Sequence, residues 1–330
     1  MKTGSVLGGM MGMIFLLLAN SALGFDLVGH RGARGLAPEN TLPSFARALS
    51  LGVTALELDT AITRDEEIVI SHDPSLNPNI TRDKDGKWLV KPGPAIHSLP
   101  FQELQQYDVG RLKPNTNYAK LFPEQKAVDG TRIPRLADLF ALVKKSGNEQ
   151  VRLNIELKVS PLKPDETLDP ETYAKRVVES IRKEGMESRV SILSFDWRTL
   201  LLVQKIAPEI PTVYLSIQQR SFDNISADKP EGSPWTAGFQ HKDHGSVPRM
   251  VKAAGGRIWS PYFGDLTEAQ LKEAHGLGLK VAVWTVNDPA QIQKMLDLGV
   301  DGIISDRPDL VRQAMAERGM ALPSATPVQP

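Results

Sequence analysis

The sequence contains no cysteine among its 330 residues, which excludes a disulfide framework and a thiolate metal site. It also has no excess of one charge, because 39 Lys and Arg residues balance 39 Asp and Glu residues. No run is rich in lysine or arginine, so we expect no nucleic-acid partner. A hydrophobic fraction of 41% with 24% charged residues is typical of a globular protein and not of a disordered or fibrous chain.

The N-terminus has the pattern of a secretory signal. Lys2 precedes an apolar run over residues 6–19, and the small residues Ala22 and Gly24 follow. This pattern predicts a cleavable signal peptide over residues 1–24. The run is shorter than the roughly 20 residues that a membrane-spanning anchor needs, and no cysteine is present for a lipoprotein anchor. We therefore expect an exported, periplasmic protein without a stable membrane anchor.

From residue 25 onward, short β-rich runs alternate with segments of helical periodicity. One helical segment, for example, begins at Asp288-Pro289 and ends before Gly299. Eight strands, each followed by a helix, predict a parallel sheet that closes into a (β/α)8 TIM barrel. The expected strands are Phe25–Gly29, Ala55–Asp59, Arg152–Leu157, Val190–Ser194, Thr212–Ser216, Arg257–Ser260, Lys280–Thr285 and Gly302–Ser305. The expected helices are Leu42–Leu51, Arg135–Lys145, Glu171–Lys183, Trp197–Ile206, Val247–Ala254, Thr267–Leu277, Pro289–Leu298 and Pro308–Glu317.

Two stretches interrupt this alternation. Residues 73–134 are rich in Pro, Asn and Lys, and we interpret them as a subdomain or lid inserted after the second strand, because structureless loops of this length are uncommon. Residues 218–245 are interpreted as a long loop over the barrel mouth. One barrel domain then spans residues 25–320, and residues 321–330 form a tail that we expect to be disordered. An open doubly wound sheet is the alternative, but no glycine-rich phosphate loop follows the first strand.

Three carboxylates fall where strands end. Glu57 and Asp59 close the second strand on one face, and Glu156 occupies the same place on the third. In a barrel these strand ends meet at one mouth, where the carboxylates would repel one another unless a cation neutralised them. The set therefore predicts a hard divalent cation with oxygen ligands. The alternative is a set of separate buried ion pairs with Arg31 and Lys158.

Two histidines are expected beside this cluster. His30 follows the first strand, and a short hairpin turning at residues 64–66 would return His72 to the mouth. Such a pair suits acid–base chemistry, in which one histidine removes a proton and the other supplies one to the leaving group. Arg31 and Lys158 are positioned to hold the oxygens of an anionic, phosphate-containing substrate. Glu39 is expected to support Arg31 and not to bind metal.

These residues together resemble the glycerophosphodiester phosphodiesterase family. The resemblance covers residues 28–308 and rests on the motifs His30-Arg31-Gly32, Pro38-Glu39-Asn40-Thr41, Glu57-Leu58-Asp59, His72-Asp73, Glu156-Leu157-Lys158, Trp284-Thr285-Val286-Asn287 and Asp301-Gly302-Ile303-Ile304-Ser305-Asp306-Arg307-Pro308.

The resemblance implies a metal-dependent TIM-barrel enzyme that splits glycerophosphodiesters into glycerol 3-phosphate and an alcohol. It implies that His30 and His72 are the acid–base pair, and that Glu57, Asp59 and Glu156 are the metal ligands. Arg31 and Lys158 would bind the substrate phosphate, and Trp284 would line the substrate pocket. The family's insertion would be residues 73–134, and the signal peptide favours the branch that uses Ca2+ over the Mg2+ branch.

Three questions stay open at this point. The histidines could activate water or the glycerol hydroxyl of the substrate, in which case a cyclic phosphate would form. A phospholipase D-type enzyme acting on lysophospholipids, or a non-catalytic exported binding protein, could carry the same barrel. The oligomeric state is also undetermined.

Overall fold

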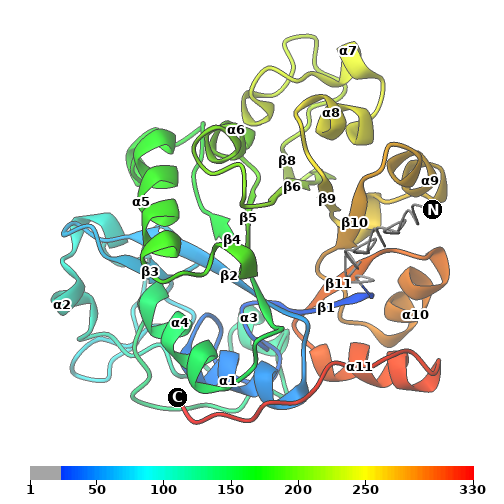
Figure 1. Cartoon of the computed structure of the whole chain (residues 1–330). Coiled ribbons are helices and arrows are strands. Elements are labelled where there is room, and N and C mark those ends of the chain that lie inside the picture. The colour runs from blue at the N-terminus through cyan, green and yellow to red at the C-terminus, as the bar shows by residue number, and fades with distance from the viewer. Residues whose placement is uncertain (1–23) are drawn as a thin grey trace, which may run out of the picture.

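The computed structural model describes residues 24–330. Eight parallel strands pair in the order β1-β11-β10-β9-β6-β5-β4-β2, and pairing of β1 with β2 closes them into a barrel (Figure 1). The predicted TIM barrel is therefore confirmed. The barrel strands are β1 (Asp26–Gly29), β2 (Ala55–Ile62), β4 (Arg152–Leu157), β5 (Val190–Ser194), β6 (Thr212–Ser216), β9 (Ile258–Pro261), β10 (Lys280–Val283) and β11 (Gly302–Ser305).

All eight expected helices are present and lie around the barrel (Figure 1). Side-chain caps fix most of their starts: for example, Thr41 accepts a hydrogen bond from the Ser44 amide at the first helix, and Asp288 accepts one from Gln291. The helices are α1 (Leu42–Leu51), α4 (Leu136–Lys145), α5 (Pro170–Lys183), α6 (Trp197–Ile206), α8 (Val247–Ala253), α9 (Glu268–Gly276), α10 (Pro289–Leu298) and α11 (Pro308–Glu317).

One strand is longer than the periodicity predicts. Strand β2 was expected to end at Asp59 but continues to Ile62, because its last residues pair with the antiparallel strand β3 (Ile68–Ile70). The hairpin expected around residues 64–66 is thus confirmed. It returns the chain to the carboxyl ends of the barrel strands just before His72.

Residues 71–135, which follow this hairpin, share a small apolar core with it. Only short helices occur there: η1 (Ile96–Ser98), α2 (Phe101–Leu104) and α3 (Asn117–Lys120). The buried side chains that form this core are Ala61, Val69, Leu76, Ile96, Leu99, Leu104, Val109 and Ile133. The segment thus packs on the β2–β3 hairpin, apart from the main core. That it is an insertion stays a prediction.

The loop after β6 and the C-terminal tail both contact the barrel. The loop contains β7 (Gln218–Gln219), β8 (Phe222–Asp223), η4 (Pro234–Thr236) and α7 (His241–His244). The tail has no regular secondary structure, yet the amide of Thr326 donates to the carbonyl of Leu49, and Val328 packs on the core. These contacts, which were not expected for a disordered tail, place the chain end beside α1 (Figure 1).

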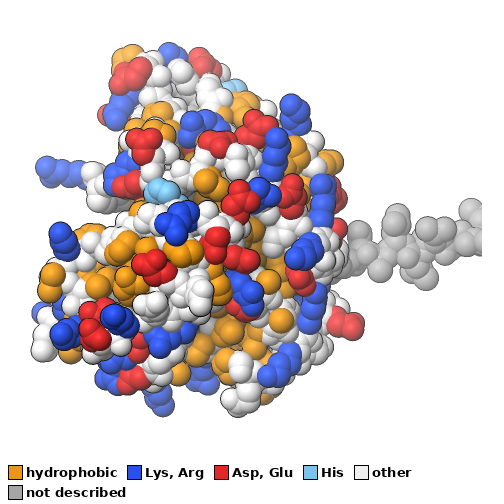
Figure 2. All heavy atoms as spheres, turned by 90° about the vertical axis from the view of Figure 1, so that its left-hand side faces the viewer, with side chains coloured by type: hydrophobic (Ala, Val, Ile, Leu, Met, Phe, Trp, Pro, Cys, Tyr) orange, Lys and Arg blue, Asp and Glu red, His pale blue; other side chains and the backbone are white. Residues whose placement is uncertain are grey.

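The described residues carry a surface of mixed charge. On the face that includes α2 and α5, basic and acidic side chains are intermingled with apolar ones (Figure 2). Within residues 24–330, no helix is both long and apolar enough to cross a bilayer. Most of the predicted signal peptide lies outside the described residues.

Candidate active site

The predicted site residues meet at one end of the barrel. A cavity of about 220 Å3 opens there, above the apolar side chains Leu193, Leu215 and Ile304 inside the barrel. Seven of the eight predicted residues line it, and the eighth, Asp59, lies buried beside them. The seven are His30, Arg31, Glu57, His72, Glu156, Lys158 and Trp284.

The three carboxylates converge because β2 and β4 are neighbours in register. Asp59 pairs directly with Glu156 across the two strands, and Glu57 lies two residues earlier on the same face. Each offers an oxygen atom, and these oxygens all lie within 4.8 Å of one another. All three residues are buried, with at most 8% of their surface exposed. The cluster expected from the sequence is therefore present.

The electrostatics of this cluster favour a bound cation. Burial and repulsion by Asp59 and Glu156 raise the pKa of Glu57 well above its ordinary value. Burial also raises the pKa of Glu156 to about 7, against the attraction of Lys158. Burial disfavours ionised Asp59 too, but Arg31, His72 and Lys158 together bring its pKa well below the ordinary value. Three buried oxygen ligands with this excess of negative charge fit a hard divalent metal ion.

The ion pairs considered as the alternative exist alongside the cluster. Lys158 Nζ donates to Glu156 Oε1 at 2.8 Å and lies 3.6 Å from Asp59 Oδ1. Arg31 Nε lies 3.2 Å from Asp59 Oδ2. Both cations lie near Asp59, so these ion pairs are not separate from one another. Arg31, Lys158 and the three carboxylates form one network.

A left-handed turn places Arg31 over the cluster. Arg31 has φ 49° and Gly32 has φ 85°, a conformation that costs energy for a residue with a side chain. A Cβ on Gly29 would lie 2.1 Å from the carbonyl oxygen of Gly32, so the turn also needs glycine there. In this turn the Arg31 amide donates to Glu57 Oε2 at 2.9 Å. The strained backbone thus anchors a metal-site carboxylate while the side chain reaches Asp59.

Glu39 has the supporting role expected for it, and a tyrosine from the segment after β3 joins it. Arg31 Nη1 donates to Glu39 Oε1 at 2.7 Å, and the Tyr118 hydroxyl donates to Glu39 Oε2. Arg34 stacks over the Phe122 ring at 4.6 Å and donates to the Tyr118 oxygen at 3.3 Å. Tyr118 on helix α3 and Phe122 just beyond that helix therefore help to hold Arg31 and Arg34 at the cavity wall.

His30 is oriented by Asp306, which follows β11. Nδ1 of His30 lies 2.7 Å from Asp306 Oδ1, and Arg34 and Asn287 donate to the same carboxylate. Although burial disfavours its ionised form, His30 and Arg34 hold the pKa of Asp306 well below its ordinary value. Burial lowers the pKa of His30 to about 4, against the attraction of Asp306. His30 is therefore neutral at pH 7, with its proton on Nδ1 and a lone pair on Nε2, which lies 3.8 Å from Glu57.

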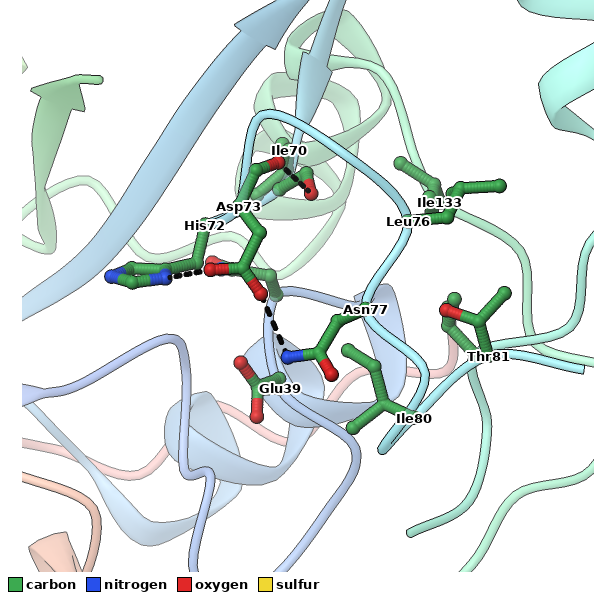
Figure 3. A pocket seen from close by; sticks show the side chains of 12 residues that line it. Glu39, Ile70, His72, Asp73, Leu76, Asn77, Ile80, Thr81 and Ile133 are labelled. Atoms are coloured by element: carbon green, nitrogen blue, oxygen red, sulfur yellow. Dashed lines mark hydrogen bonds and ion pairs between the residues drawn. The ribbon is translucent and has the colours of Figure 1, made fainter. Parts of the chain in front are cut away.

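His72 lines the same cavity and has a similar partner. Figure 3 shows the Nδ1 side of its ring turned toward Asp73, which in turn faces Asn77. The distances are 2.9 Å from His72 Nδ1 to Asp73 Oδ1 and 2.7 Å from Asn77 Nδ2 to Asp73 Oδ2. Burial, together with Arg31 and Lys158, lowers the pKa of His72. Two neutral histidines with fixed tautomers thus face one cavity.

Trp284 forms part of the cavity wall. Its Nε1 donates to the carbonyl of Ser260 at 2.9 Å, and its ring meets that of Phe195 edge to face at 5.4 Å. Phe195, Arg34, Tyr118 and Asp306 were not singled out from the sequence. Asp306 and Phe195 carried a usable signal, because each directly follows a barrel strand, β11 and β5.

Comparison with known proteins identifies the family. Residues 30–310 match the model of the glycerophosphoryl diester phosphodiesterase family. A crystal structure from Silicibacter pomeroyi, assigned as such a phosphodiesterase, is 36% identical, with 90% of this chain and 95% of that chain covered and a TM-score of 0.81.

Two curated relatives align over nearly their whole length. The glycerophosphodiester phosphodiesterase of Caldanaerobacter subterraneus is 26% identical over 89% of this chain and 98% of the relative. A human lysophospholipase D is 26% identical over 93% of this chain and 94% of the relative. The chain belongs to the glycerophosphoryl diester phosphodiesterase family and is a phosphoric diester hydrolase.

Proposed function

We propose that this protein hydrolyses glycerophosphodiesters such as glycerophosphocholine and glycerophosphoethanolamine to sn-glycerol 3-phosphate and an alcohol. The phosphorus–oxygen bond to the alcohol breaks, and water supplies the phosphate oxygen and the alcohol proton. The observation that carries this proposal is the single cavity in which two neutral histidines face three buried carboxylates and two cations.

Glu57, Asp59 and Glu156 would hold one divalent cation. All three ligands are oxygens, which suit Ca2+ and Mg2+ alike; we propose Ca2+ because the predicted export signal favours the branch of the family that uses it. When bound, such an ion offsets the negative charge of the phosphodiester, which otherwise repels nucleophiles.

The protein's own groups then divide the remaining work. Arg31 and Lys158 bind phosphate oxygens and stabilise the charge that develops on them. One histidine, in its neutral form, accepts a proton through Nε2 from water or from the glycerol hydroxyl. The other must first carry a second proton on Nε2, and this imidazolium donates that proton to the leaving alkoxide. Asp306 and Asp73 keep the two rings in the tautomer and orientation that this exchange needs. Trp284 contacts the substrate at the cavity wall.

The proposal is tested by assaying release of glycerol 3-phosphate from glycerophosphocholine after treatment with EDTA and after adding Ca2+ or Mg2+. We expect activity to vanish with the chelator and to return, with Ca2+ more effective than Mg2+. Lysophosphatidylcholine, assayed in parallel, tests the phospholipase D-type reaction for which the human relative is named. Binding of either compound without turnover would instead support a non-catalytic exported protein.

Replacing Asp306 by asparagine is expected to lower kcat by at least about 10- to 100-fold, the range found when the outer partner of a metal-bound histidine is removed. KM should change less, because Asp306 lies behind His30 and Arg34. Asp309→Asn is the matched control, since within residues 24–330 the Asp309 side chain pairs with Arg307 alone. Equal kcat values for the two variants would contradict the role of Asp306.

We also propose that the chain is exported to the periplasm. The support is the sequence pattern of residues 1–24 alone. N-terminal sequencing of the mature protein should begin at Phe25, and a mature chain that begins at Met1 would contradict the signal peptide.

A further inference from the structure

A second, larger cavity adjoins the catalytic one. Its volume is about 360 Å3, against about 220 Å3 for the catalytic cavity. The two share five lining residues, so they are continuous: His72, Glu156, Lys158, Phe195 and Trp284. A glycerol and a phosphate do not need this additional space.

The walls of the second cavity are mainly apolar and aromatic. We call it the aromatic groove, defined by Val159, Phe195, Ile217, Phe222, Trp235 and Trp284. Its rings form an edge-to-face series from the catalytic cavity outward: Trp284 to Phe195 at 5.4 Å, Phe195 to Phe222 at 5.3 Å, and Phe222 to Trp235 at 5.2 Å. Each of these four rings is only partly buried, so apolar surface faces the groove.

The outer wall is held in place before any ligand arrives. Phe222 and Trp235 belong to the loop after β6, and buried Asn224 ties that loop to the barrel. Its side chain accepts from the Ile217 amide at 2.9 Å and donates to the carbonyl of Leu215 at 3.1 Å. The Ser233 hydroxyl donates to the Asn224 carbonyl at 2.6 Å, next to Trp235. A preformed wall reduces the entropy lost when a ligand binds.

The charges along the groove favour an uncharged ligand over a quaternary ammonium. Lys158 Nζ already lies 5.8 Å from the centre of the Phe195 ring, where a ligand cation would otherwise bind. The two carboxylates that line the groove are both paired: Glu156 with Lys158 and Glu166 with Lys163, at 2.8 and 2.9 Å.

We infer that the aromatic groove binds a hydrocarbon chain covalently attached to the phosphodiester, so that the enzyme prefers amphiphilic diesters to glycerophosphocholine itself. This inference rests on the proposed function, because the chain is placed by its connection to the phosphate at the catalytic cavity. The chain could be attached to the glycerol or to the leaving alcohol. The groove chemistry is the same in both cases.

Two series of soluble substrates test this inference, with chains of two to eight carbons kept below the concentration at which they aggregate. One series carries an acyl chain on the glycerol of glycerophosphocholine, and the other is glycerol phosphate esterified to n-alkanols. In one series we expect kcat/KM to rise about two- to fourfold for each buried methylene and then level off. The series that responds identifies the side on which the chain is attached.

Variants of the outer wall locate the effect. Phe222→Ala and Trp235→Ala should reduce the gain per methylene to less than about 1.5-fold, while activity on glycerophosphocholine changes less than about twofold. Phe222→Leu keeps an apolar side chain and should retain most of the gain per methylene. This variant controls for misfolding as the cause of the loss in Phe222→Ala. Trp88→Ala is the matched control, because Trp88 stacks near Arg82 away from the groove.

The outcomes separate this inference from the proposed function. If glycerophosphocholine is hydrolysed but neither series shows a dependence on chain length, the groove does not bind a chain. The same follows if the dependence survives in Phe222→Ala and Trp235→Ala. If no diester of any length is hydrolysed, the proposed function itself fails.

Discussion

Replacing either His30 or His72 by alanine is expected to lower kcat on glycerophosphocholine by about 100- to 10,000-fold, the range that a positioned general acid or base contributes. The physical reason is that each ring presents Nε2 to the cavity while Asp306 or Asp73 holds Nδ1. The measurement is steady-state release of glycerol 3-phosphate at saturating substrate. His241→Ala is the control, since His241 lies on α7, outside the cavity.

A diester with a good leaving group assigns the two roles. Glycerol phosphate esterified to p-nitrophenol needs no proton for departure of the phenolate. The variant that lacks the general acid should therefore recover most of its rate on this compound, whereas the variant that lacks the general base should not. Near-normal rates for both alanine variants on glycerophosphocholine would contradict the assignment of the histidines.

The second large effect concerns the carboxylate cluster. Because burial and mutual repulsion raise the pKa of Glu57 and bring that of Glu156 to about 7, the folded, metal-free protein binds protons more tightly than the unfolded chain. This contribution to stability is fully present below the unfolded pKa, near 4.5, and is lost as pH rises through the folded values. We expect the contribution of this cluster to the unfolding free energy of the metal-free protein to fall by about 1–3 kcal/mol between pH 5 and about pH 8, while His30 and His72, whose pKa values are lowered on folding, oppose this loss below about pH 6.5.

A bound divalent cation should remove that loss. Denaturation curves at pH 8 with EDTA, Mg2+ or Ca2+ measure the effect, and a ligand at 100 times its Kd adds about 2.7 kcal/mol. Glu57→Gln resembles the protonated carboxyl, so without metal it should be at least as stable as the wild type at pH 8. Its gain from Ca2+ should nevertheless shrink, and its kcat/KM should fall by about 100-fold or more.

Glu103→Gln is the matched control for this variant, because Glu103 is exposed and distant from the cluster. A Glu57→Gln protein that kept both the full stabilisation by Ca2+ and the full activity would contradict the metal site. Equal unfolding free energies of the wild type in EDTA and in Ca2+ would also contradict the metal site. The denaturation measurements do not depend on the identity of the substrate.

The sequence by itself determined the order of the barrel and the positions of its main polar groups. Strands and helices have short repeating patterns, and side chains at i and i+2 of a strand share a face, so Glu57 and Asp59 could be placed together without any contact being known. The resemblance of the strand-end motifs then supplied roles for His30 and Trp284. Strand β2 was predicted too short because its extension depends on pairing with β3, which no local pattern shows.

Only the tertiary structure decided which groups support these residues. Asp306 reaches His30 across 276 positions of sequence, and Tyr118 joins the Arg31 network from a segment with no helical or strand periodicity. The aromatic groove is assembled from Val159, Phe195, Ile217 and the loop after β6 in the same way. Such contacts depend on how the chain folds back on itself and leave no period in the sequence, so composition and spacing could not reveal them.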